Sequence, residues 1–221
     1  MSVQINHINY VIAGKNISVE NFSITWLMKE GIFSEAEVDR GVTTPIFKQY
    51  ENETYSSLFT PDRIQITIKK PSEVSKKSAP QIAAILNKII LKYTNNYFAL
   101  GINLSFEVPV KGKIETVSKK LFLPNSSEFA NFFSEENNLF GGAFSKDFEG
   151  FKLTLGVDPH KNDNADTKDK FRLSFNYNYL FSQDGGTDAM ASDTIKMLNK
   201  YDEIYDFSNK IASCLDVNGE R

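Results

Sequence analysis

The clearest pattern in the chain is an alternation of apolar and polar residues, which is most regular in residues 98–108. Every second residue from Phe98 to Val108 is apolar, and the residues between them are small or polar. Successive side chains of a strand point to opposite faces, so this segment predicts a strand with one face on a core. The other face would meet water, a ligand or a partner. We expect Phe98 to face the core with the other apolar residues.

Similar alternation marks other segments of the chain. It is strong at 63–69, 151–157 and 171–181, and weaker at 3–12 and 55–59. Strands that are buried on both faces read as continuous apolar runs, whereas these segments alternate. The pattern therefore predicts a mainly antiparallel sheet of about five to seven strands with a single covered face.

Two long helices are predicted to cover the apolar face of this sheet. The first spans about 78–93, with Pro80 in its first turn, and the second begins near Ser192 and continues to Leu215. Shorter helices are predicted from their capping and apolar spacing, and two polar segments are predicted to be exposed connections. The short helices are 34–40 and 126–136, and the connections are 109–120 and 158–170.

The predicted fold class is α+β, a twisted and mainly antiparallel sheet with two long helices packed on one face. A chain of 221 residues is long enough to bury one large core, so we expect a single domain over 1–221. Residues 1–54 could form a peripheral N-terminal subregion of that domain.

Composition and charge narrow the possible partners and compartments. With 25 basic and 28 acidic residues, the net charge of −3 gives no general attraction to nucleic acid or to an anionic membrane. Cys214 is the only cysteine, so no intramolecular disulfide can form, and no targeting signal follows Met1. No segment reaches the roughly 18 apolar residues that span a bilayer. These features predict a soluble, cytoplasmic protein.

Catalytic and metal-binding residue types are scarce. His7 and His160 are the only histidines, and no Cys/His spacing typical of zinc is present. The acidic segment 158–169 does not fit a calcium loop, because Lys168 stands where the loop needs glycine. A pattern like that of metal-dependent nucleases at Pro61-Asp62 lacks its second carboxylate, which Thr67 replaces. We therefore predict no catalytic residues, no metal and no cofactor.

Two surfaces are candidates for binding. The first is the polar face of the sheet, where the aromatic residues needed for base stacking are not expected, so nucleic acid is an unfavoured ligand. The second is the first long helix, which has apolar residues on more of its circumference than a sheet can cover. The candidate sheet residues are Arg63, Gln65, Asn103, Glu107, Arg172 and Asn176, and the candidate helix residues are Ala83, Ala84 and Leu91.

Some segments resemble a known family. The segment LFTPDRIQITI at 58–68, the strand LGINLSF at 100–106 and the pattern Leu198-x-x-Tyr-Asp-Glu-Ile-x-x-Phe207 are similar to a sporadically distributed family of uncharacterised prokaryotic proteins. The similarity covers residues 55–108 and 190–212. It implies patchy occurrence in prokaryotic genomes, as expected of mobile-element or defence-associated accessory genes. The family offers no catalytic residues to transfer to this chain.

These patterns favour a non-enzymatic cytoplasmic interaction or accessory protein that recognises a protein partner or self-associates. Two other functions stay open. One is a hydrolase-type enzyme that uses Asp, Glu and Lys chemistry, and the other is a small-ligand sensor. Both would use a pocket between the sheet and the N-terminal 50 residues.

Overall fold

The computed structural model describes residues 3–34, 41–74, 79–92, 96–123, 132, 135, 137–162, 168–182, 184 and 186–215. The short helices predicted at 34–40 and 126–136 lie outside the described residues, apart from single positions.

The strands form one large antiparallel sheet that does not close into a barrel. They are β1 (Gln4–Lys15), β2 (Val42–Thr43), β3 (Lys48–Glu51), β4 (Tyr55–Phe59), β5 (Arg63–Ile68), β6 (Asn96–Pro109), β7 (Gly142–Phe148), β8 (Phe151–His160) and β9 (Lys170–Leu180). In the described residues these nine strands lie in the order β2-β3-β4-β5-β1-β6-β9-β8-β7. The predicted α+β class and antiparallel sheet are confirmed, with more strands than expected.

The additional strands are short or exposed. Strand β3 has four residues, and the edge strand β7 is exposed along most of its length, so neither shows an apolar alternation. One sequence signal for β7 was Gly150, in the two-residue connection Glu149-Gly150 that precedes β8. In the structure φ is 50° at Glu149 and 87° at Gly150. Tight hairpins favour such positive φ values, and glycine adopts them readily.

The helices depart from the two that the sequence predicted. They are α1 (Ile24–Lys29), α2 (Pro71–Val74), α3 (Ala79–Lys92), α4 (Ile114–Phe122), α6 (Gly186–Leu198) and α7 (Tyr201–Leu215), with a 3₁₀ turn η1 at Val19–Asn21. The predicted second helix is two helices, interrupted at residues 199–200. Leu198, Tyr201 and Ile204 keep helical spacing across the interruption, which is why the sequence hides it. The prediction of two long helices is therefore not confirmed in that form.

Two predicted connections also differ from the structure. Residues 109–120 were expected to be an exposed connection, but α4 occupies Ile114–Phe122. This helix is held on the core side of the sheet by contact of Phe122 with Phe171, whose ring centroids are 5.9 Å apart. In the predicted loop 158–170, strand β8 continues to His160, and residues 163–167 lie outside the described part.

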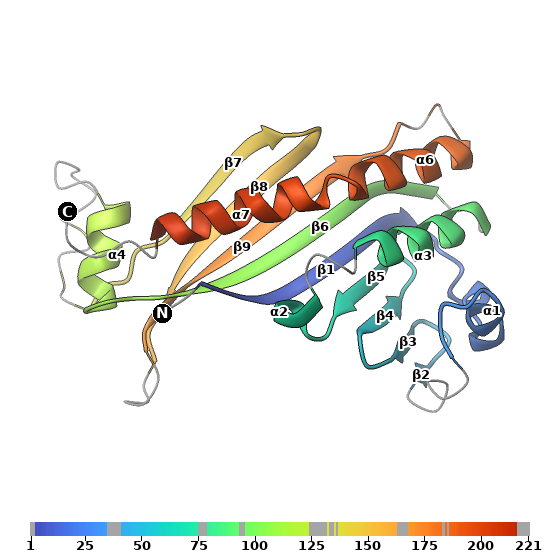
Figure 1. The fold of residues 1–221 in the computed structure, drawn as a ribbon, viewed down its shortest axis with the longest axis horizontal. Helices are drawn as coiled ribbons and strands as arrows, with labels where there is room; N and C mark the ends of the chain where they lie inside the picture. The colour runs from blue at the N-terminus through green and yellow to red at the C-terminus, as the bar shows by residue number, and fades with distance from the viewer. Residues whose placement is uncertain are drawn as a thin grey trace.

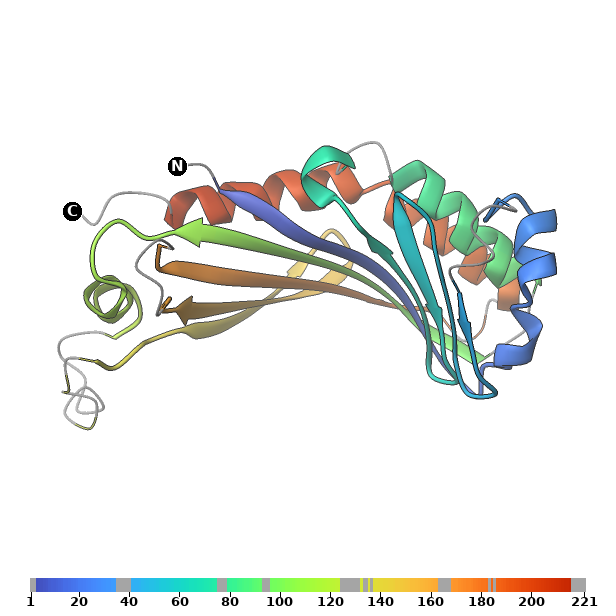
Figure 2. The same cartoon turned by 90° about the horizontal axis from the view of Figure 1, so that it is seen from below.

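The sheet is bowed and carries its helices on one side. Figure 2 shows α3, α6 and α7 above the same face, with α1 and α4 at opposite ends of the sheet. Apolar side chains from these helices join those of the strands in one core cluster. Tyr177 of β9, for example, is buried and lies 2.7 Å from the Ser208 hydroxyl of α7. Burial raises the pKa of Tyr177 to about 12, so its phenol stays protonated at neutral pH.

The two halves of the chain repeat one arrangement of elements. Each half has a long strand, then a helix, then a run of antiparallel strands that returns toward the long strand, and then helix on the core side (Figure 1). Apart from the short elements η1, β2 and α2, the first half is β1, α1, β3, β4, β5 and α3, and the second is β6, α4, β7, β8, β9 and α6–α7. The long strands β1 and β6 pair at the centre of the sheet, and Asn9 pairs with Asn103 near their midpoints. Residues 1–54, considered above as a peripheral subregion, therefore include a central strand.

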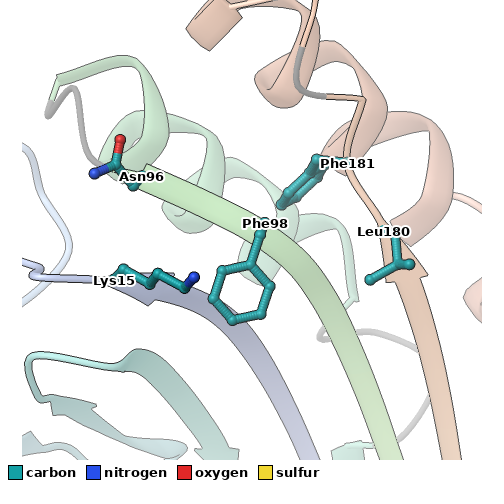
Figure 3. Close-up of a pocket in the computed structure, with 5 residues that line it drawn as sticks. All are labelled: Lys15, Asn96, Phe98, Leu180 and Phe181. Carbon is teal, nitrogen blue, oxygen red and sulfur yellow. The ribbon is translucent and has the colours of Figure 1, made fainter.

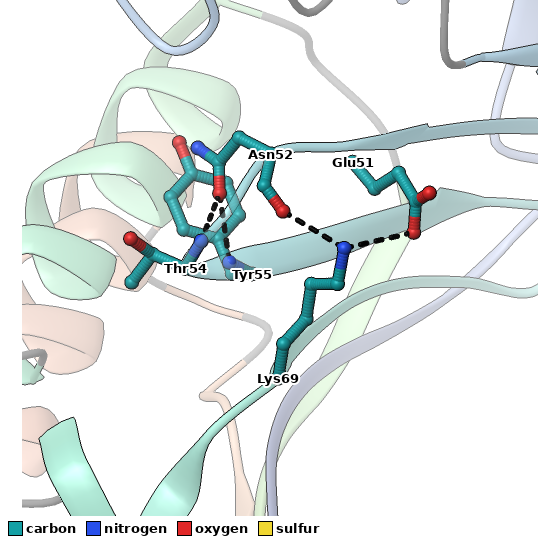
Figure 4. A network of polar contacts seen from close by, with 5 residues as sticks. All are labelled: Glu51, Asn52, Thr54, Tyr55 and Lys69. Carbon is teal, nitrogen blue, oxygen red and sulfur yellow. Dashed lines mark hydrogen bonds and ion pairs between the residues drawn. The ribbon is translucent and has the colours of Figure 1, made fainter.

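A polar network fixes the turn between β3 and β4 (Figure 4). The side-chain oxygen of Asn52 accepts hydrogen bonds from the backbone N–H groups of Thr54 and Tyr55, both at 2.8 Å. The Lys69 ammonium, at the end of β5, donates to the Asn52 carbonyl at 3.0 Å and forms an ion pair with Glu51 at 3.3 Å. These contacts stabilise the hairpin and fix the register in which β3 pairs with β4.

Candidate functional site: the open face of the sheet

We use the name open face for the sheet surface opposite the core, formed by the outward-pointing residues of β1 and β3–β9. All six predicted sheet residues lie on it. Five of them stand between buried neighbours of their own strand, as Asn103 does between Ile102 and Leu104, and Arg63 begins β5 directly before the buried Ile64. In Figure 2 no helix of the described residues covers this side of the sheet. The phase of the alternation was therefore sufficient to place these side chains.

One row of polar residues crosses the open face from the edge strand β7 to β3, the neighbour of the other edge strand β2. The strand registers align one polar residue from each of eight adjacent strands. In order across the sheet these are Ser145, Thr154, Asn176, Asn103, Asn9, Thr67, Ser56 and Glu51. At about 4.8 Å per strand, the row is about 34 Å long. We call it the polar row.

The centre of the polar row is a chain of side-chain hydrogen bonds that point in one direction. The Asn176 amide donates to the Asn103 side-chain oxygen, and Asn103 Nδ2 donates to Asn9 Oδ1 at 2.6 Å. Asn9 Nδ2 lies 2.9 Å from His7 Nε2. Because an amide N–H₂ group can only donate, the imidazole Nε2 accepts, and the neutral ring carries its proton on Nδ1. Burial lowers the pKa of His7, which favours this neutral form.

Several residues beside the centre of the polar row are small. On the His7 side, the next row across the sheet contains Ser105, Ser174 and Gly156, and on the other side Gly101 lies between Val11 and Asn178. Short side chains leave the amides of the polar row accessible from above. The arrangement can therefore donate hydrogen bonds to, and accept them from, a ligand that lies across the strands.

Charges of both signs lie toward the ends of the strands. Lys170 pairs with Glu107 at 2.8 Å, and Lys152 pairs with Asp147 at 3.4 Å. Arg63 and Arg172 occupy equivalent positions in the two halves. Arg63 lies four residues before Thr67, which pairs with Asn9, and Arg172 lies four residues before Asn176, which pairs with Asn103.

Phe98 does not face the core as the alternation predicted. A β-bulge lies between β1 and β6, because Ala13 pairs with Ala99 while Gly14 pairs with Tyr97. The extra residue, Phe98, is thereby displaced from the core register, and 37% of its surface is exposed. Leu180 on β9 points to the same side in Figure 3 and is 69% exposed.

A pocket of about 470 Å³ lies where β1 and β9 end and β6 begins (Figure 3). It is lined by Lys15, Asn96, Phe98, Leu180 and Phe181. Sequence reasoning missed this pocket, because a bulge depends on the pairing of two strands and leaves no mark in the alternation of one.

The candidate interface on α3 is smaller than predicted. Leu91 is 50% exposed and Ala84 is exposed, but Ala83 is only 7% exposed and belongs to the core cluster. The reason is that α6 packs beside α3, so this helix buries residues against a second helix as well as against the sheet. The wide apolar stripe of α3 therefore reflects two buried contacts within the chain.

Within the described ranges, no three His, Cys, Asp or Glu side chains are grouped so as to hold a metal ion. None of the helices described is long and apolar enough to cross a membrane.

The polar row also includes residues that the sequence did not single out, above all Asn9. This residue alternates with Ile8 and Tyr10 in β1, but its alignment with Asn103 and Asn176 depends on the order of the strands.

Comparison with known proteins gives no relative from which a role could be transferred. No family model matches this chain, and no curated protein is significantly similar to it. The function must therefore be inferred from the geometry of the open face.

Proposed function

We propose that this chain is a non-enzymatic interaction protein that recognises a protein partner through the open face of its sheet. The observation that carries the proposal is the polar row, a continuous line of amide and hydroxyl groups across seven strands that ends at the Glu51 carboxylate on an eighth. A polypeptide offers a donor and an acceptor at nearly every residue, which these side chains can match. At about 3.3 Å per residue, a row about 34 Å long corresponds to about ten extended residues.

The charges on the open face favour protein over nucleic acid. Nucleic-acid binding depends mainly on unpaired positive charge that can replace the counterions of phosphates. Here Lys170 and Lys152 are already paired with Glu107 and Asp147, and Arg63 and Arg172 each lie four residues away from the polar row along their strands. In the described part of the face, the large aromatic side chain is Phe98, which lies at one end and not along the polar row. Stacking of successive bases on this row is therefore not supported.

The geometry around His7 supports binding more than hydrolysis. Ser105 lies opposite His7 in the paired strands, which would be the arrangement of a nucleophile and a base. However, the Nε2 lone pair of His7 accepts the Asn9 amide, and Nδ1 carries the proton. The ring therefore has no lone pair with which to take a proton from Ser105. An enzyme that uses Asp, Glu and Lys, or a small-ligand sensor, is the alternative to be tested.

Photocrosslinking in the producing cell tests the proposal. A photoreactive amino acid at Asn178, exposed on the open face, should crosslink a protein, whereas the same group at Lys196, exposed on α6, should not crosslink that protein. The captured protein is then purified and its affinity for this chain is measured directly. Thr154→Trp, which places a large side chain on the polar row beside Asn176, should weaken binding at least tenfold, and Lys196→Trp should leave it unchanged.

Three results would overturn the proposal. They are nucleic acid captured in place of protein at Asn178, equal capture of the same protein from both positions, and unchanged affinity in the Thr154→Trp variant. Circular dichroism of each variant shows whether the fold is retained.

Light scattering on the same samples reports whether two copies associate. The candidate contacts for such an association are Ala84 and Leu91 on α3 and the edge strand β7.

A further inference from the structure

The pocket beside Phe98 combines an apolar wall with one positive charge. The Phe98 ring and the Leu180 side chain are exposed toward it, although large apolar side chains are normally buried. Because of the β-bulge, the Phe98 ring near the start of β6 is exposed and does not pack in the core. Bulges are enriched next to functional sites, where they re-aim a side chain.

Lys15 supplies the charge. Its side chain extends from the end of β1 toward the Phe98 ring (Figure 3), and no carboxylate in the described part of the chain pairs with it. Asn96 adds an amide at the start of β6. An ammonium group and an amide N–H₂ group are both donors, and a carboxylate is the acceptor that satisfies them best.

We propose that this pocket binds the C-terminal residue of a protein partner, with an apolar side chain against Phe98 and Leu180 and the α-carboxylate on Lys15 and Asn96. The apolar and charged groups line the same small space, so the ligand must carry both on one residue. The inference rests on the proposed function, since the same partner would occupy the open face. Along β6, Phe98 in the pocket lies five residues from Asn103, or about 17 Å, which a short tail can span.

The openness of the pocket to solvent favours a tethered residue over a free acid. A site on an exposed strand end buries only part of its ligand, so it gives weak affinity when it acts alone. A residue joined to a partner already held on the open face would bind at a high effective concentration. A free fatty acid or aromatic acid has no such assistance.

Chemical-shift changes in ¹⁵N-labelled protein test the inference with defined probes. The first probe is the peptide acetyl-Gly-Ser-Gly-Ser-Leu with a free carboxylate, the second is its C-terminal amide, and the third is octanoate. We expect the free-acid peptide to shift the backbone signals of Lys15, Asn96 and Phe98, and to bind about tenfold tighter than the amide, as loss of a charge-assisted hydrogen bond predicts.

Variants separate the two parts of the pocket. Lys15→Met keeps the length of the side chain but removes its charge, so it should bind the acid and the amide equally. Leu180→Ser should weaken binding of both peptides. Lys196→Met, which removes an exposed lysine on α6, away from the pocket and the open face, is the matched control and should behave like the wild type.

The inference is overturned if the acid and the amide bind equally to the wild type, if the shifted signals lie elsewhere, or if octanoate binds as tightly as the peptide. Each of these results leaves crosslinking at Asn178 unaffected, so failure of the pocket can be told apart from failure of the open face.

Discussion

At the scale of single residues, Asn103 is central to the polar row, because it accepts from Asn176 and donates to Asn9. Replacing it by alanine removes both hydrogen bonds and leaves two amides without their partner. We predict that Asn103→Ala lowers the free energy of unfolding by about 1–2 kcal/mol. Urea denaturation measures this change. Asn178→Ala, an exposed asparagine on the same face, is the control and should change stability by less than about 0.5 kcal/mol.

His7 should make the stability of the protein depend on pH. Burial lowers the pKa of His7 in the folded state below the ordinary value of 6.5, so the unfolded chain binds a proton more readily. Stability that depends on neutral His7 is therefore fully present above about pH 7 and is lost as the pH falls through 6.5 toward the folded pKa.

Denaturation at pH 7.5 and 5.5 checks this sign, and NMR titration of the His7 ring reports its pKa directly. In His7→Gln, the glutamine oxygen can still accept from Asn9, so most of the stability at pH 7.5 should remain. The loss of stability between these two pH values should be smaller than in the wild type. A wild-type pH dependence in this variant would contradict the role assigned to His7.

At the scale of the elements, the phase of each strand decides which substitutions are costly. Leu104 and Phe175 point into the core and are 1% exposed, so we predict that Leu104→Ala and Phe175→Ala each lower the free energy of unfolding by about 2–5 kcal/mol. Ser105→Ala, one position along β6 on the open face, should change it by less than about 0.5 kcal/mol. The melting temperatures of the three variants check this prediction. If the register were wrong, Ser105→Ala would lower the melting temperature more than Leu104→Ala and Phe175→Ala.

Strands β6 and β9 could be predicted because one face of each is buried along nearly its whole length. Strand β7 could not, since an exposed edge strand has no apolar period, and the interruption between α6 and α7 preserves the helical spacing of its apolar residues. For the site, alternation placed Arg63, Asn103 and Arg172 on the correct face. It could not show that Asn9 joins Asn103 or that a bulge exposes Phe98, because both depend on how β1 pairs with β6.

At the scale of the whole molecule, the two halves share one core, and β1 and β6 are hydrogen-bonded along most of their length. We therefore predict that the chain unfolds in a single cooperative transition. The fluorescence of Trp26, the only tryptophan, reports on the first half, whereas far-ultraviolet circular dichroism reports on both. The two signals should give the same urea midpoint. Earlier loss of the fluorescence signal would show that the halves unfold separately.

Because both halves lie in one chain, the pairing at the centre of the sheet does not depend on the protein concentration. The first half alone would leave β1 as an unpaired edge, free to bind the equivalent strand of another molecule. Such a pairing would be bimolecular, and it would be lost at low protein concentration. In this chain β6 fills that place and is separated from α3 by only three residues, so the contact is intramolecular. The continuous surface across the centre of the sheet, with Asn9 and Asn103 at its middle, therefore forms in a single copy of the chain, however scarce that chain is in the cell.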